Sequence, residues 1–119
     1  MSGEIIGLDN LEKRLKDLAK VLSKDEFLKS AKDGMTIYVE GPAKRNTPID
    51  TGRLRNSETT IIHKDQVITG TNVEYAPPVE FGSGNRRAKP FMRPAWDEGK
   101  SKVVEHMEEQ AQKNIRSIL

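Results

Sequence analysis

The sequence lacks cysteine and contains only two histidines among its 119 residues. The absence of cysteine excludes disulfides, thiolate zinc sites and cysteine nucleophiles. With His63 and His106 as the only imidazoles, a histidine-rich metal site is excluded as well. We therefore expect neither a metal ion nor another cofactor.

Long apolar runs and a surplus of one charge sign are missing too. No apolar run approaches the ~18–20 residues of a membrane helix, and no secretory signal is visible, so we expect no membrane association. Lysine and arginine number 20 against 18 acidic residues, which gives a net charge of +2. That balance is not typical of a dedicated nucleic-acid binder. Aromatic residues make up 5% and hydrophobic residues 34% of the chain, so we predict one domain over residues 1–119 with a modest core.

A leucine pattern predicts the first helix. Leucines recur at steps of three and four from Leu8 to Leu22, which places them on one helical face. Asp9 and Glu12 form a start signal for this helix. We expect the helix to pack on a core, since about two heptads are too few to argue a coiled coil.

A second helix is predicted directly after the first. Ser23 opens a capping box, and apolar helical spacing then continues to Tyr38. The β-branched stretch 36–39 makes a strand the rival interpretation there. Gly41 and Pro42 should kink or end this helix, because proline lacks a backbone donor and clashes with the preceding turn.

The middle of the chain predicts a loop and a hairpin. Residues 44–52 are rich in turn formers. Two β-branched runs, 57–63 and 67–71, flank a short polar connection at 64–66, a pattern typical of an antiparallel hairpin.

Residues 75–96 predict a long loop excursion. They hold four of the six aromatic residues and four of the six prolines around a glycine-rich basic stretch. We expect the aromatics to pack the excursion onto the sheet and the last helix, while residues 83–89 are disordered in an isolated subunit. The aromatics are Tyr75, Phe81, Phe91 and Trp96.

A long helix from about Pro94 to the C-terminus closes the chain, because Trp96, Val103, Met107 and later apolar residues share one face. The predicted fold class is α+β. It has two N-terminal helices, a small antiparallel β-sheet with a long loop excursion, and a long C-terminal helix.

The tripeptide Asp50-Thr51-Gly52 has a catalytic namesake in the Asp-Thr-Gly signature of retroviral-type aspartic proteases, in which two aspartates share a proton. In those proteases the aspartate follows an apolar strand of an all-β chain. Here it follows Thr47-Pro48-Ile49 in a largely helical one. We interpret the tripeptide as a turn and expect no catalytic residue and no enzymatic activity.

Basic residues gather in two loops. One set flanks residues 46–52, and the other comprises Arg86, Arg87, Lys89 and Arg93. Such side chains contact phosphate without reading sequence, or pair with acids of the same or a neighbouring chain. We predict the second set as an interface or a DNA-channel lining.

Three segments in order resemble those of one family: Ala43–Ser57, Val73–Ser83 and Lys89–Ala95. The family is the small tail-completion, or head–tail joining, proteins of long-tailed double-stranded DNA bacteriophages, also described as neck or minor tail proteins. The sequence departs from the family pattern at Pro78 and at Gly41-Pro42. The motif positions that the resemblance marks as structural are Asp50, Thr51, Gly52, Leu54, Tyr75, Glu80, Phe81, Gly82, Pro90, Phe91 and Pro94.

The resemblance implies a non-enzymatic virion protein, assembled in the bacterial host cytoplasm, that forms a ring at the head-proximal end of the tail. It implies a homo-oligomer, usually hexameric, whose partners are the head connector and tail tube proteins. DNA passes through such a ring without sequence-specific binding. A tail terminator or another connector ring subunit remains an alternative, as does a non-specific DNA-binding accessory protein.

Overall fold

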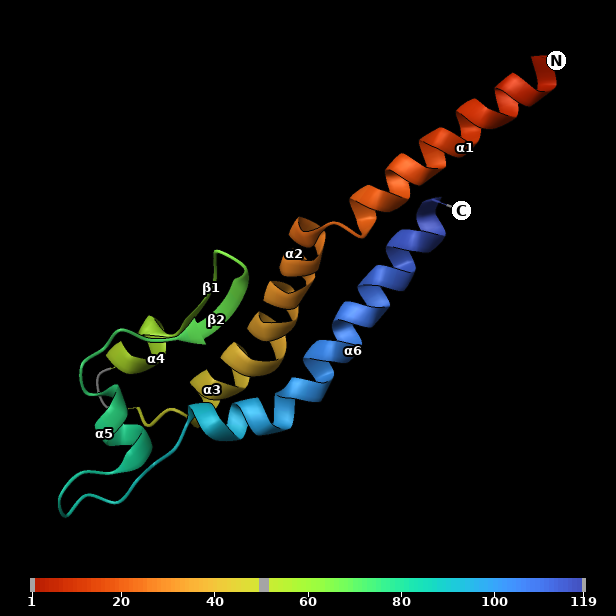
Figure 1. Cartoon of the computed structure of the whole chain (residues 1–119). Coiled ribbons are helices and arrows are strands. Elements are labelled where there is room, and N and C mark those ends of the chain that lie inside the picture. The colour runs from red at the N-terminus through yellow and green to blue at the C-terminus, as the bar shows by residue number, and fades with distance from the viewer. Residues whose placement is uncertain (1, 50–51, 119) are drawn as a thin grey trace.

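Helices form both ends of the protein, and a small sheet lies beside them (Figure 1). The computed structural model describes residues 2–49 and 52–118, with side chains from residue 10 onward. The molecule measures 81 × 23 × 19 Å, and its Cα radius of gyration is 20.7 Å. A compact chain of this length would have a radius of about 13.5 Å. The fold class is α+β, as predicted.

Helix α1 spans Ser2–Val21 and is the main cause of this elongation. It begins well before Asp9, so the predicted start signal is wrong. Its predicted place on the core is wrong as well, because Leu11, Leu15 and Leu22 are each about half exposed or more. The helix projects past the body and lies beside the C-terminal end of the last helix (Figure 1).

The second helical region continues further than predicted. α2 spans Lys24–Met35, and Ser23 caps it by accepting the Glu26 N–H at 3.3 Å. A π-helical turn, Thr36–Glu40, and α3, Gly41–Asn46, follow in unbroken helical backbone. Stretch 36–39 is therefore helical, and Gly41-Pro42 does not end the helix.

The π turn accommodates Pro42. A regular α-helix would take a hydrogen bond from position 42 to the Tyr38 carbonyl, which proline cannot donate. In the structure the Gly41 N–H bonds back five residues to the Thr36 carbonyl. The widened turn thus passes the proline without a break.

Helix α6, Met92–Ile118, packs closely against this region. It begins two residues before Pro94, close to the prediction. A Cβ at Gly99 would overlap the Tyr38 carbonyl oxygen, and one at Gly34 would lie 3.1 Å from Val103 Cγ1. The first core cluster fills the same crossing and consists of Val39, Ala43, Ala95 and Val103.

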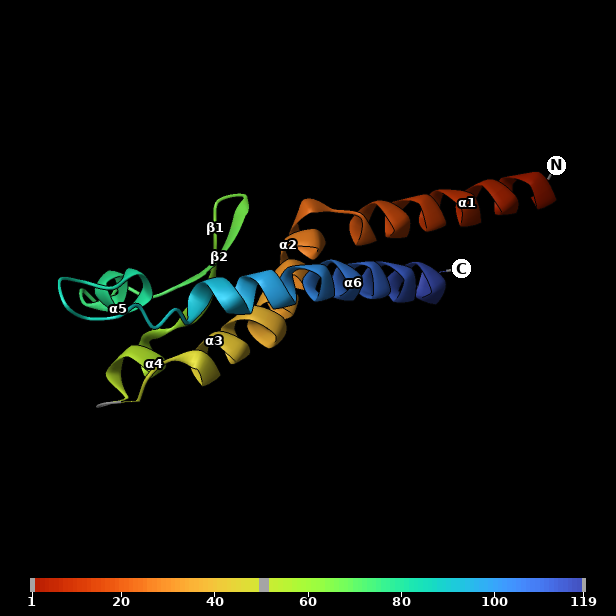
Figure 2. The same ribbon diagram turned by 90° about the horizontal axis from the view of Figure 1, so that it is seen from below.

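Strands β1, Thr59–His63, and β2, Gln66–Gly70, form the predicted hairpin. They pair antiparallel, with Ile61 opposite Ile68, and Lys64 in the turn has a left-handed φ of 55°. Thr60 is buried on the face toward α2 and the π turn. Figure 2 shows the hairpin standing beside the helices.

Two short helices complete the fold. They are α4, Arg53–Ser57, and α5, Ala76–Phe81. With the start of α6 they enclose a second core cluster of Leu54, Val73, Ala76 and Phe91. Residues 83–89 turn back sharply, with Ser83 and Arg86 exchanging backbone hydrogen bonds and the Lys89 N–H donating to the Val79 carbonyl.

Candidate functional site

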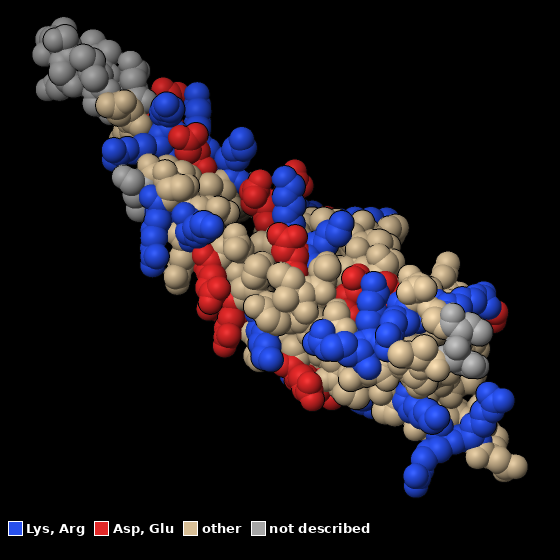
Figure 3. All heavy atoms as spheres, turned by 180° about the vertical axis from the view of Figure 1, so that it is seen from behind, with Lys and Arg blue, Asp and Glu red and all other residues tan. Residues whose placement is uncertain are grey.

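A basic groove of about 850 Å³ lies where the predicted motif segments meet. Its cationic side chains come from α4 and from the turn that follows α5. Among the described lining residues the groove has four cations and no carboxylate. Figure 3 shows lysine and arginine side chains gathered at the end of the molecule opposite α1. The described lining residues are Pro48, Ile49, Gly52, Arg53, Leu54, Tyr75, Pro78, Val79, Arg86, Arg87 and Lys89.

Arg53 of α4 contacts two residues that precede α5, Glu74 and Tyr75. Its guanidinium donates to both carboxylate oxygens of Glu74 at 3.1 Å and lies 5.6 Å from the centre of the Tyr75 ring. A backbone hydrogen bond at Glu74, followed by Arg53, lowers the pKa of the Glu74 carboxyl. This exposed pair and the cation–π contact hold α4 against the start of α5.

Two glycines with left-handed backbone lie before the segments that carry the groove's cations. Gly52 has a φ of +79°, and Gly82 has a φ of +82°. A Cβ at Gly82 would lie 3.0 Å from the Arg86 carbonyl oxygen. Both motif positions therefore favour glycine, because other residues rarely adopt this conformation. Asp50 and Thr51, the other two residues of the predicted turn, lie outside the described residues.

Glu80 has a role that its sequence position did not reveal. Its Oε1 accepts the backbone N–H groups of Phe91 at 3.1 Å and Met92 at 2.9 Å, and its Oε2 accepts that of Arg93 at 3.4 Å. These are free donors at the start of α6, where a carboxylate also complements the helix dipole. The one sequence signal is that no serine, threonine or aspartate stands immediately before α6 to cap it.

The structure divides the predicted basic set. Arg86, Arg87 and Lys89 join Arg53 at the basic groove, whereas Arg93 lines a second groove of about 620 Å³. We call this second one the aromatic groove. Its lining residues are Thr69, Gly70, Thr71, Ala76, Pro77, Glu80, Phe81, Phe91, Met92, Arg93 and Trp96.

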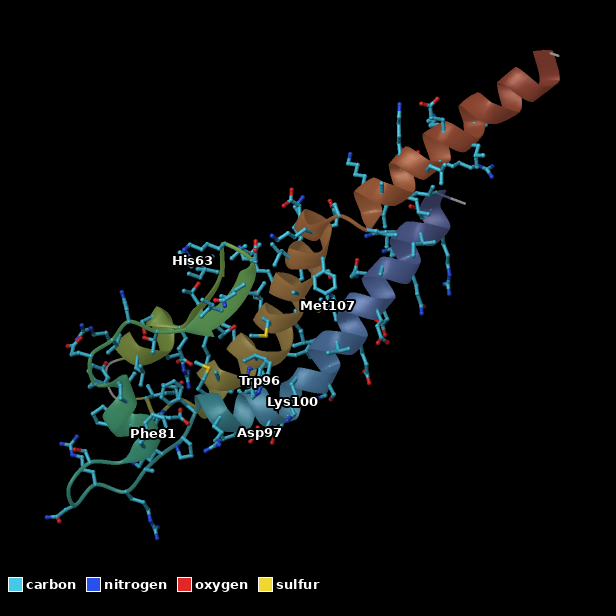
Figure 4. The ribbon with its side chains drawn as sticks, viewed as in Figure 1. His63, Phe81, Trp96, Asp97, Lys100 and Met107 are labelled. Carbon is cyan, nitrogen blue, oxygen red and sulfur yellow. The ribbon has the colours of Figure 1, made fainter. Side chains whose placement is uncertain are left out.

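The predicted aromatic anchors behave differently from one another. Phe91 is buried and Tyr75 packs against the second core cluster, as expected. Phe81 is 76% exposed and Trp96 is 45% exposed, so their predicted packing is wrong. Figure 4 shows the two side chains on α5 and α6. Both side chains line the aromatic groove, and they stay exposed because no other part of the described chain covers them.

Pro90 is exposed just before α6, whereas Pro94 lies in its first turn, where proline costs no intrahelical hydrogen bond.

One buried polar contact was not predicted. Glu58 is 1% exposed, and its Oε2 lies 2.6 Å from Thr47 Oγ1, which is also 2.6 Å from the Ala43 carbonyl oxygen. The single Thr47 proton cannot serve both acceptors. A protonated Glu58 resolves this, since it donates to Thr47 while Thr47 donates to Ala43. Burial raises the pKa of Glu58, against the effects of Thr47 and two nearby cations.

In the described part of the chain, no group of three or more histidine, aspartate or glutamate side chains could hold a metal ion. No helix there is long and apolar enough to cross a membrane.

Taken together, the motif residues fix backbone junctions and line exposed grooves in a small, elongated α+β protein. A family model described as "Bacteriophage HK97-gp10, putative tail-component" matches residues 9–82. The chain belongs to this family and is a component of a phage tail. The match includes the first motif segment and all of the second except Ser83, and it ends at Gly82, before α6. No curated protein and no solved structure matches the chain.

Proposed function

We propose that this protein is a non-enzymatic ring subunit at the head-proximal end of the tail, which joins the tail to the head connector and leaves a channel for DNA. Membership of a tail-component family supports a structural role in the virion. Beyond this structural role, we propose the head-proximal position in the tail and assembly as a ring.

The observation that carries the proposal is the large apolar surface of the single chain. Large apolar side chains stay exposed in α1, α2, the hairpin, α5 and α6, although the core clusters are small. Subunits of an assembly bury such surface against their neighbours. The exposed residues include Leu11, Leu15, Leu22, Phe27, Ile61, Ile68, Phe81, Trp96 and Val104.

A null mutation of the gene, followed by negative-stain microscopy of the lysate, tests the position. We expect filled heads beside unjoined tails, and rescue by the wild-type gene. Tails of abnormal length would favour a terminator instead. Normal infectious particles would contradict a joining role.

The basic groove favours a second candidate, a non-specific DNA-binding accessory protein. Arg86, Arg87 and Lys89, which line this groove on the turn after α5, are placed to contact phosphates. Fluorescence anisotropy with duplex DNA across a salt series tests this, because phosphate contacts produce a steep salt dependence. Weak binding at moderate salt favours the joining role.

The double variant R86A/R87A examines the groove in assembly. If the groove contacts a partner ring or passing DNA, the variant folds normally but joins heads to tails poorly. The double variant K100A/K102A removes the same charge from exposed positions of α6 and should join normally. Wild-type joining by R86A/R87A would contradict a role for the groove.

A further inference from the structure

Each strand of the hairpin has an outer edge without a strand partner. The sheet contains only β1 and β2 among the described residues. No backbone–backbone hydrogen bond outside the β1–β2 ladder involves residues 59–70 in that part of the chain. An isolated two-stranded hairpin is marginally stable, and open edges accept further strands.

These edges lack the usual protection of a monomer. Solvent-exposed edge strands normally carry lysine, other charges or proline that oppose pairing. Neither Thr59–His63 nor Gln66–Gly70 contains such a residue, although 32% of the chain is charged. The residues at the ten strand positions thus have the composition expected of strands that are paired on both edges.

The outward face of the hairpin is apolar where the two strands meet. Thr60 and Thr69 face the helices, with Thr60 buried and their hydroxyls 2.8 Å apart. Ile61 and Ile68 lie opposite each other on the other face, and both are more than 40% exposed. An added strand would extend this isoleucine pair into a row.

We propose that the β2 edge of one copy pairs antiparallel with the β1 edge of the next copy, so that hairpins form a continuous sheet between subunits. This inference rests on the ring of the proposed function. Each copy offers one β1 edge and one β2 edge, so the contact is head-to-tail, the kind that closes into a ring. In the simplest register, Ile68 of one copy lies opposite Ile61 of the next.

Charges at the turn are complementary in this arrangement. Lys64 follows β1 and Asp65 precedes β2, so Asp65 of one copy would lie beside Lys64 of the next. Asp65 also pairs with Lys24 at the start of α2, which anchors the turn to the body. Like charges would not meet at this end of the sheet.

The aromatic groove adjoins the same edge. Thr69, Gly70 and the exposed Phe81 and Trp96 line it, whereas no residue of β1 does. In the next copy, α4 directly precedes β1. A copy paired with β2 would therefore place its α4 region at this groove and cover aromatic side chains that are exposed in the single chain.

Cysteine cross-linking tests the pairing cleanly because the chain contains no cysteine. The variants I61C and I68C carry different tags and are mixed, and disulfides are sought in purified protein at high concentration and in assembled particles. Directly opposite positions on neighbouring strands are close enough for a disulfide. We expect I61C–I68C dimers, with T59C and H63C linking less to I68C.

The controls make each outcome decisive. S101C, exposed on α6, is the matched control and should not link to I68C. Cross-links of I68C with itself, or of I61C with itself, would indicate edge pairing about a two-fold axis and overturn the proposal. Absence of links from I68C to residues 59, 61 and 63, in both protein and particles, would overturn it as well.

A second variant separates this inference from the proposed function. I68K places a charge on the outward face, and we expect it to keep its circular dichroism but to self-associate about ten- to hundredfold more weakly. Rings that form without the cross-link would overturn strand pairing and leave the ring proposal standing. If the subunits cross-link but the null mutant of the phage still joins heads to tails, strand pairing stands and the proposed joining function is overturned.

Discussion

At the residue scale, two glutamates that look alike in the sequence have opposite environments. Glu80 accepts three backbone N–H groups at the start of α6, so both of its carboxylate oxygens have partners. Glu58 is buried with one oxygen unpaired within the described structure, and burial favours its neutral form. Neither environment follows from the neighbouring sequence, because both depend on contacts with distant segments.

Replacement of Glu58 by glutamine should stabilise the protein at neutral pH. The pKa of Glu58 is raised above its ordinary 4.5, so the folded chain holds this proton more tightly than the unfolded chain. The stability that the protonated Glu58 contributes is fully present below about pH 4.5 and is lost as the pH rises through the folded-state pKa. Glu58→Gln should remove that loss, while its amide still donates to Thr47.

Urea unfolding of the wild type and Glu58→Gln between pH 4 and 8 measures this difference. The exposed Glu105→Gln on α6 serves as the control and should not alter the pH profile. A glutamine variant that is less stable at pH 7 would mean that Glu58 is held as a carboxylate by Lys44 and Arg55.

Replacement of Glu80 by alanine should destabilise the fold by about 1–2 kcal/mol, because three donors at the start of α6 lose their acceptor. Glu80→Gln retains one oxygen and should lose less. Chemical denaturation provides the comparison, with the exposed Glu98→Ala as control. Equal stability of Glu80→Ala and Glu98→Ala would remove the assigned capping role.

At the element scale, the contact between α6 and the π turn determines how the helices pack. The Tyr38 carbonyl, whose α-helical donor position is Pro42, points at Gly99 on α6. Sequence periodicity predicted both helices and the hairpin, since those patterns are local. It left open whether Gly41-Pro42 would kink or end the helix, because the packing of the π turn against α6 joins Tyr38 and Gly99, which are 61 positions apart.

Gly99→Ala should be among the most damaging small substitutions in the chain. The added Cβ would overlap the Tyr38 carbonyl oxygen and lie 2.9 Å from its carbon, so the helices must move apart. We expect a loss of about 3 kcal/mol or more, at the upper end for overpacking. Thermal unfolding of Gly99→Ala beside Gly70→Ala, which has open space around its Cβ, provides the test. Similar melting temperatures would show that the crossing tolerates a wider spacing.

At the scale of the whole molecule, α1 lies outside the core. Both core clusters lie between residues 39 and 103, and the helix touches mainly the C-terminal end of α6. The leucine pattern predicted an amphipathic helix correctly but could not say what its apolar face contacts. An amphipathic helix serves a core or a neighbouring subunit equally well.

Deletion of residues 1–22 should leave the body folded. We expect the free energy of unfolding to change by less than about 1 kcal/mol, as for regions that contribute little to a core. Small-angle scattering should show a radius of gyration below the 20.7 Å of the full chain. Loss of cooperative unfolding would mean that the contact with α6 is required for the fold.

The sequence by itself determined the long helical segments, the presence of the hairpin and the turn at Gly52, because periodicity, capping residues and left-handed backbone act within a few residues. It did not predict the short helices α4 and α5, which lie in segments whose composition is typical of loops. The motif segments also indicated the phage tail family without structural help. Only the tertiary structure decided that α1 leaves the core, that Glu80 caps a helix eleven residues away, and that Arg93 separates from Arg86 and Arg87. These outcomes depend on which distant surfaces meet, and that is set by packing of the whole chain.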